Sequence, residues 1–179
     1  MATTGGSSAR TSRVLDPAFV ERLEEQPLDE LRRRRDEALA EREYESYLRR
    51  LVQVRHDILR AEQARRAAGE EPVPVMERLA SVLSAGPKGS GRGEALRLNL
   101  SPVDVAEAER RADEALAGLS LATPEDADDD QLGEALENLE REERAVSDAR
   151  AAVIGVHDRL QEELKRRYRE DPTLITQGK

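Results

Sequence analysis

Cysteine is absent from this sequence of 179 residues, and aromatic residues are almost absent. Without cysteine the chain forms no disulfide, no thiolate metal site and no thiol nucleophile. The aromatic residues are Phe19, Tyr44, Tyr47 and Tyr168, whereas charged residues make up 37% of the chain. A composition poor in aromatic residues and rich in arginine, glutamate, alanine and leucine is typical of long helices rather than of a β-sandwich or a barrel.

Long apolar runs are also missing. No segment approaches the roughly 20 consecutive apolar residues of a membrane-spanning helix. Residues 1–12 are small and polar and lack the apolar region of a signal peptide. We therefore expect a cytoplasmic protein that does not enter a membrane. The net charge of -9 argues against direct binding to DNA and allows a basic protein partner.

Groups suited to catalysis or metal binding are sparse. The two histidines, His56 and His157, lie too far apart in the sequence to form a local HExxH site. The acidic run at residues 126–130 lacks the spacing and the glycine of an EF-hand, and residues 88–93 lack the order of a P-loop. No nucleophile–base pair or cofactor loop is visible, so we expect neither a metal site nor an enzyme.

Two long segments carry the signals of helices. Residues 28–68 contain neither glycine nor proline, and Gly69 follows them where a helix C-cap belongs. Residues 124–170 begin with acidic and end with basic side chains, which suits the helix dipole, and Pro172 stops the helix. Apolar residues of this second segment recur every seven positions, as in a coiled coil: Leu132, Leu139, Val146, Val153 and Leu160.

Two such helices bury their apolar stripes most economically when they pack antiparallel to each other. We therefore predict an all-α fold: an antiparallel helical hairpin or coiled coil of two long helices, with short helices in the connecting segment. Residues 14–171 would form this single domain, between a disordered tail at residues 1–13 and a second tail at residues 172–179. Within the domain, Asp16 would cap a short helix that begins at Pro17.

The connecting segment at residues 70–123 is far longer than the usual connection of about two to eight residues between antiparallel helices. Two short amphipathic helices are expected in it, one near residues 75–85 and one that begins at Ser101 and Pro102. Their apolar residues are candidates for binding a partner protein: Met76, Leu79, Val82, Leu83, Val105, Leu116 and Leu119. The alternative is that these helices fold back onto the hairpin, and the sequence favours neither possibility.

A polar pattern is repeated on the two long helices, outside their apolar stripes. The copy on the first helix consists of Glu43, Ser46, Arg49, Gln53 and Asp57. The copy on the second helix consists of Glu143, Ser147, Arg150 and Asp158, with Ile154 at the position that corresponds to Gln53. At about 100° per residue, each copy covers one face of its helix beside the apolar stripe. In a hairpin the two polar faces could flank one groove, although a solvated charged face is the other interpretation.

The residue types of the pattern favour a nucleotide ligand. Arginine presents a planar fork of donors that suits a phosphate or the O6 and N7 atoms of guanine. A carboxylate accepts hydrogen bonds from guanine N1–H and N2–H₂, and a serine hydroxyl can donate to a phosphate oxygen. Two equivalent sets suggest a ligand with approximate two-fold symmetry. A symmetric nucleotide that contains guanine and two phosphates would fit.

The sequence resembles the RsiG-type anti-sigma factors of sporulating actinomycetes. That family carries the signature Glu-x3-Ser-x2-Arg-x3-Gln-x3-Asp once on each helix of a coiled coil. In the first copy here, Arg42 holds the strict glutamate position and Glu43 lies beside it, and in the second copy Ile154 holds the glutamine position. The resemblance implies that both copies bind cyclic di-GMP, which the family holds as an intercalated dimer of the nucleotide.

The resemblance also implies a mechanism. An RsiG-type protein is not an enzyme; it holds a sigma factor of the WhiG type inactive, and cyclic di-GMP is required for that complex. Sequestration keeps the sigma factor from RNA polymerase, so sporulation genes stay off while cyclic di-GMP is abundant. The alternative function is that of a structural coiled-coil adaptor protein with no small-molecule ligand.

Overall fold

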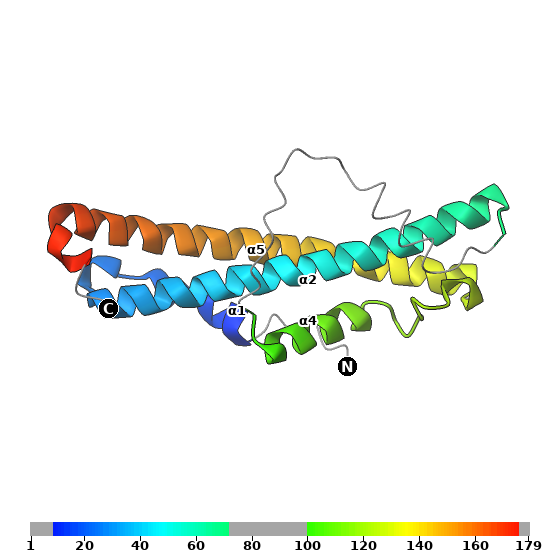
Figure 1. The fold of residues 1–179 in the computed structure, drawn as a ribbon, viewed down its shortest axis with the longest axis horizontal. Helices are drawn as coiled ribbons and strands as arrows, with labels where there is room; N and C mark the ends of the chain where they lie inside the picture. The colour runs from blue at the N-terminus through cyan, green and yellow to red at the C-terminus, as the bar shows by residue number, and fades with distance from the viewer. Residues whose placement is uncertain (1–8, 72–99, 176–179) are drawn as a thin grey trace. The chain divides into compact units, whose positions relative to one another are not determined.

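The computed structural model describes residues 9–71 and 100–175, and every regular element within these ranges is helical. The two long helices are α2 (Leu28–Ala68) and α5 (Asp129–Glu170). The short elements are the helices α1 (Ala9–Val14) and α4 (Pro102–Glu114) and the 3-10 turns η1 (Pro17–Val20), η2 (Leu23–Glu25), η3 (Pro124–Asp126) and η4 (Pro172–Ile175). The predicted all-α fold is confirmed (Figure 1).

Two compact units divide the chain, and each long helix contributes a part to both of them. Unit 1 comprises Met1–Ser46 and Ser147–Lys179, and unit 2 comprises Tyr47–Val146. Hydrogen bonds between the long helices include Arg32–Tyr168 and Arg150–Ser46 in unit 1, and Arg49–Glu143 and Arg66–Asp129 in unit 2. Within each unit, higher residue numbers on α2 meet lower numbers on α5. The two helices therefore run antiparallel in both units, as predicted.

The apolar stripe of α5 is buried along its length. The five residues of the predicted seven-residue repeat are at most 2% exposed: Leu132, Leu139, Val146, Val153 and Leu160. The stripe of α2 is buried equally well, with 0% exposure at Leu31 and Ala38 in unit 1 and at Leu48, Val52 and Leu59 in unit 2. In unit 1 the core also includes apolar side chains of α1, η1 and η2. The predicted coiled-coil register is thus confirmed.

Residues 9–13 do not belong to a tail, contrary to the prediction, because they form most of α1. Two carboxylates of α2, Glu41 and Glu45, are fully buried, and the hydroxyl of Thr11 lies within hydrogen-bond distance of both. Arg10 adds an ion pair with Glu41. A buried carboxylate is costly unless donors satisfy it. Polar contacts therefore hold α1 against α2, and hydrophobic periodicity gives no sign of them.

Three predicted helix caps are confirmed. The carboxylate of Asp16 accepts a hydrogen bond from the backbone N–H of Ala18 at 2.8 Å at the start of η1. The hydroxyl of Ser101 accepts one from the N–H of Asp104 at 3.1 Å at the start of α4. Gly69 follows α2 with a φ of 68°, the left-handed conformation that glycine adopts without strain.

The second long helix begins at Asp129, later than the predicted Pro124. A capping box is the physical reason: Asp128 Oδ1 accepts from the N–H of Gln131 at 2.8 Å, and Gln131 Oε1 accepts from the N–H of Asp128 at 3.0 Å. Beyond the C-terminal end of α5, residues 172–175 form η4 rather than a free tail. Arg32 holds this turn by donating a hydrogen bond to the carbonyl of Leu174 at 2.6 Å.

A Glu-x2-Arg-Arg cluster lies in the C-terminal part of α2 and fastens the turn that leads into α5. Glu62 is fully buried and accepts hydrogen bonds from both Arg65 and Arg66. Arg66 also donates to the carbonyls of Pro124 and Ala127, at 3.0 and 2.8 Å. These carbonyls lie in and just after η3, so the cluster joins the end of one long helix to the start of the other.

The same cluster recurs near the end of α5. Glu163 accepts hydrogen bonds from Arg166 and Arg167. Arg167 donates to the carbonyls of Leu23 and Glu24, at 2.8 and 3.1 Å, in the turn that leads into α2. Each unit therefore contains one such clamp, built from one glutamate and two arginines.

Acid is expected to weaken the fold through these clamps. The hydrogen bonds from Arg65 and Arg166, respectively, lower the pKa values of Glu62 and Glu163 from 4.5 to about 2. Because the folded pKa lies below the unfolded one, the stabilisation is complete above about pH 4.5 and is lost as the pH falls towards 2. Urea unfolding followed by circular dichroism should give a midpoint that declines through this window.

A double variant, Glu62→Gln and Glu163→Gln, is the matched control because it removes both titrations. Its unfolding midpoint should be lower at pH 7 and should decline less between about pH 4.5 and 2 than that of the natural chain. Parallel pH profiles for the two proteins would contradict the assignment of this stability to the clamps.

Candidate ligand-binding site

The predicted ligand-binding residues fall into two groups, one in each unit. Unit 1 holds Glu43, Ser46, Ser147, Arg150 and Asp158, and unit 2 holds Arg49, Gln53, Asp57 and Glu143. Each group takes residues from both α2 and α5, and therefore from both copies of the motif.

In unit 2 the two copies of the motif are bonded directly to each other. Glu143 Oε1 of the second copy accepts from Arg49 Nε at 2.9 Å and from Gln53 Nε2 at 3.3 Å, both of the first copy. The side chains of Arg49 and Glu143 are 39% and 30% exposed. The ion pair is therefore open to solvent on one side, where a ligand can compete for either partner.

A hollow of about 390 Å³ includes this carboxylate in its lining. Its residues are Gln53, His56 and Asp57 from α2 and Glu140, Glu143 and Arg144 from α5. The Asp57 side chain is 61% exposed, and the neighbouring His56 is 25% exposed. His56 Nε2 lies 3.5 Å from Glu140 Oε1. Three motif residues thus share the hollow with three residues outside the motif.

In unit 1 the two copies also meet. Arg150 Nε of the second copy donates to Ser46 Oγ of the first at 2.9 Å. The Ser46 hydroxyl in turn donates to the carbonyl of Arg42 at 2.7 Å. Both side chains are partly buried, as are those of Glu43 and Ser147. The structure therefore places a guanidinium beside a hydroxyl, two groups that can donate to a phosphate oxygen.

Asp158 has surroundings that differ from those of Asp57. Its side chain is 68% exposed and lies 3.3 Å from Nδ1 of His157, a residue that is itself only 7% exposed. Asp158 lines a broad hollow of about 800 Å³, whose other residues come from Val20–Glu24 and from α5 between Arg159 and Arg169. No other motif residue lines this hollow.

The two departures from the family signature affect a single pair of positions. In the alignment of the two copies, position 42 corresponds to Glu143 and position 154 corresponds to Gln53. The counterpart of the Gln53–Glu143 hydrogen bond of unit 2 is therefore the pair Arg42 and Ile154 in unit 1. An isoleucine side chain has no donor or acceptor, so this counterpart cannot form the same bond. The two groups are chemically unequal at this pair.

The repeat extends beyond the motif, and the sequence reasoning missed this. At the same offset as Ser46 and Ser147, the two long helices have further identical residues, including Leu31/Leu132, Glu41/Glu142, Val52/Val153, Leu59/Leu160, Glu62/Glu163, Arg65/Arg166 and Arg66/Arg167. Aligning the chain with itself would have found this signal. The repeat includes core positions and both clamps, so the motif is part of a helix that occurs twice.

The candidate partner-binding residues have a mixed outcome. Met76, Leu79, Val82 and Leu83 lie outside the described residues. Leu116 is only 5% exposed, and Val105 and Leu119 are partly buried. Leu116 therefore packs within its own unit.

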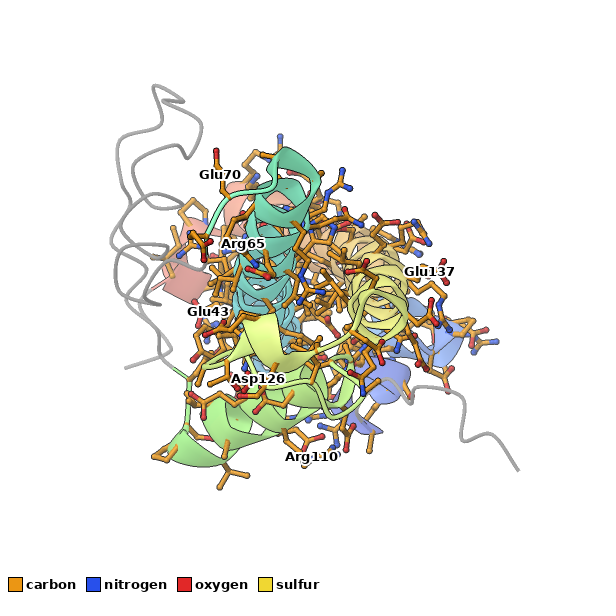
Figure 2. All side chains as sticks on the ribbon, turned by 90° about the vertical axis from the view of Figure 1, so that its right-hand side faces the viewer. Glu43, Arg65, Glu70, Arg110, Asp126 and Glu137 are labelled. Atoms are coloured by element: carbon orange, nitrogen blue, oxygen red, sulfur yellow. The ribbon has the colours of Figure 1, made fainter. Side chains whose placement is uncertain are left out.

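Helix α4 is fastened to both long helices within unit 2. Arg55 of α2 pairs with Asp113 at 2.6 Å, and Arg111 pairs with Glu142 of α5 at 2.7 Å. Ala108 is fully buried. Arg110 lies on the opposite, outer face of α4, with its side chain 55% exposed (Figure 2). For this described part of the connecting segment, the structure therefore shows the folded-back arrangement.

The fold and the repeated motif define a protein of two long antiparallel helices with a group of polar motif residues in each unit. The sequence model of the family described as RsiG-like matches residues 17–83, so this part of the chain is similar to the RsiG-like family. The match covers less than half of the 179 residues; it includes the first motif copy and ends before the second. No curated protein matches the chain.

The family match confirms the resemblance and supports a role as an anti-sigma factor, a regulatory rather than an enzymatic function. A sigma factor is accordingly the partner that the family suggests. Within the described ranges, no helix is long and apolar enough to cross a membrane. The same ranges contain no cluster of three or more histidine, aspartate or glutamate residues arranged to hold a metal ion.

Proposed function

We propose that this protein binds cyclic di-GMP through the repeated motif and, with the nucleotide bound, sequesters a sporulation sigma factor of the WhiG type. One observation carries the proposal: residues of the two motif copies contact each other across the long helices. Arg49 and Gln53 bind Glu143, and Arg150 binds Ser46. A merely solvated charged face has no reason to join motif residues of one helix to motif residues of the other in this way.

The arginines supply the groups that an anionic ligand needs. Arg150, with Ser46 beside it, can donate to a phosphate oxygen in unit 1. In unit 2 a phosphate competes with Glu143 for Arg49. When Arg49 turns to the phosphate, the Glu143 carboxylate becomes available to accept from guanine N1–H and N2–H₂. The two copies thus offer both kinds of group that a guanine nucleotide requires.

The exposed aspartates of the motif complete the set of acceptors. Asp57 and Asp158 are 61% and 68% exposed, so both carboxylates are accessible to the edge of a guanine base. Because each copy contributes one aspartate and one arginine, the ligand would be two-fold symmetric, and a dimer of cyclic di-GMP has that property. The net charge of -9 suits a partner with a basic surface, as a DNA-binding sigma factor has.

Calorimetric titration of the purified full-length chain tests the proposal. Cyclic di-GMP should bind to the chain, alone or with a WhiG-type sigma factor from the same genome, whereas cyclic di-AMP should not. The sigma factor should bind much more tightly when cyclic di-GMP is present. Sigma binding that is indifferent to the nucleotide, with no heat of nucleotide binding, would support the structural adaptor instead.

A further inference from the structure

We propose that the hollow of unit 2 is a guanine-selective subsite in which Arg144 and His56, two residues outside the motif, bind the base together with Asp57. This inference rests on the proposed function and names the part of the nucleotide that the hollow would hold. The volume of about 390 Å³ leaves room for a purine base at the edge of the Gln53–Glu143 contact.

Arg144 is the positively charged group that the hollow offers to a ligand. Three carboxylates line the hollow, those of Asp57, Glu140 and Glu143, and Arg144 is the one arginine in the lining. Arg49 forms an ion pair with Glu143, one of the residues that line the hollow. Arg144 is exposed, and it makes no ion pair or hydrogen bond within residues 9–71 and 100–175. Its guanidinium is therefore available to a ligand without breaking a contact.

The donors and acceptors at the rim match guanine and not adenine. The exposed Asp57 carboxylate can accept from N1–H and N2–H₂, while Arg144 can donate to O6 and N7. Adenine has an unprotonated N1, which repels the carboxylate, and an N6 amino group, which repels the guanidinium. The pair Asp57 and Arg144 would therefore select guanine in two ways: both side chains form hydrogen bonds with guanine, and both repel adenine.

His56 provides a planar surface at the side of the hollow. Its ring lies between two carboxylates: Nδ1 is 3.8 Å from Asp57 Oδ1, and Nε2 is 3.5 Å from Glu140 Oε1. These neighbours orient the ring, which is 25% exposed, so that a base can stack on it. The corresponding His157 of unit 1 is only 7% exposed and is not among the residues that line the hollow beside Asp158. The two motif copies thus differ in the base contact they can make.

Titration of the full-length chain with cyclic di-GMP and cyclic di-AMP tests the subsite, under the conditions in which the natural chain binds. Arg144→Ala should weaken cyclic di-GMP binding by about tenfold to a hundredfold, the effect of losing hydrogen bonds from a charged group. His56→Ala should weaken it less, because stacking on one face is lost but both polar partners remain. The preference for cyclic di-GMP over cyclic di-AMP should narrow in Arg144→Ala.

Arg141→Ala is the matched control, because Arg141 is an exposed arginine of the same helix, bonded to Asn138 and outside the hollow. Its affinity should stay within about twofold of that of the natural chain, since surface substitutions have small effects. Arg144→Lys separates the two possible roles of the cation. Lysine keeps the charge but not the planar fork of donors. The preference of Arg144→Lys for cyclic di-GMP over cyclic di-AMP should therefore be as small as that of Arg144→Ala.

The outcomes separate this inference from the proposed function. If the natural chain binds no cyclic di-GMP, alone or with the sigma factor, both are overturned. If the natural chain binds and Arg144→Ala binds equally well, only the subsite is overturned. Full affinity and full selectivity in Arg144→Lys would show that the residue acts as a phosphate charge, and would also overturn the guanine-selective role.

Discussion

Replacing Arg150 with alanine is expected to weaken the binding of cyclic di-GMP by about tenfold to a hundredfold, and Arg49→Ala should have an effect of the same size. Each arginine is the cation of its motif copy, and hydrogen bonds to charged groups contribute about 1.5–3 kcal/mol. Changing both should remove binding from the measurable range. Calorimetry gives the affinities, and circular dichroism gives helicity and the melting temperature.

The fold should be nearly indifferent to either change. Arg150 donates to Ser46, whose hydroxyl keeps its bond to the carbonyl of Arg42 when the arginine is removed. Glu143 keeps the donor of Gln53 when Arg49 is removed. Arg110→Ala is a suitable control, because Arg110 pairs with Glu107 and Glu114 of its own helix, α4, outside the motif. A loss of helicity as large as the loss of affinity would show that the motif arginines are structural.

Replacing Glu62 with alanine is expected to lower the free energy of unfolding by about 3 kcal/mol. Removing one member of a buried ion pair costs about 3–5 kcal/mol. Here Arg65 and Arg66 both lose the carboxylate that they share, while Arg66 keeps its ion pair with Asp129. Arg66 would also be less well placed to hold the carbonyls of the turn before α5. Denaturant unfolding at pH 7, followed by circular dichroism, measures the change.

Glu107→Ala is the matched comparison. Glu107 also pairs with an arginine three residues later, Arg110, but its side chain is 42% exposed. An exposed ion pair of this kind contributes less than about 1 kcal/mol. The equivalent change in the second clamp, Glu163→Ala, should resemble Glu62→Ala because its carboxylate is also held by two arginines. Equal effects at Glu62 and Glu107 would show that burial of the clamp contributes nothing.

Local signals explain how much of the fold could be predicted. The bounds of α2 follow from the glycine- and proline-free run and from Gly69, and both act within a few residues of the helix end. The buried repeat of α5 follows from its period alone, because every seventh residue returns to nearly the same face. Antiparallel pairing then follows from the need to bury two apolar stripes.

Contacts between distant residues explain what could not be predicted. Helix α1 depends on the pairing of Thr11 with Glu41 and Glu45, about thirty residues away, and polar pairs of this kind leave no periodic trace. The position of α4 depends on Arg55 and Glu142, on two different helices. Its amphipathic pattern is equally compatible with a partner protein, so the folded-back arrangement required the structure.

For the candidate site, the sequence by itself determined the residue types, their spacing and the helix faces that carry them. It also showed that the set occurs twice, because a helical repeat is a local property of each segment. Only the tertiary structure decided that Glu143 meets Arg49 and Gln53, that Arg150 meets Ser46, and that His56 and Arg144 share a hollow with Asp57. The physical reason is register: the axial offset and rotation of two packed helices are set by how all their core side chains interlock, and no single segment contains that information.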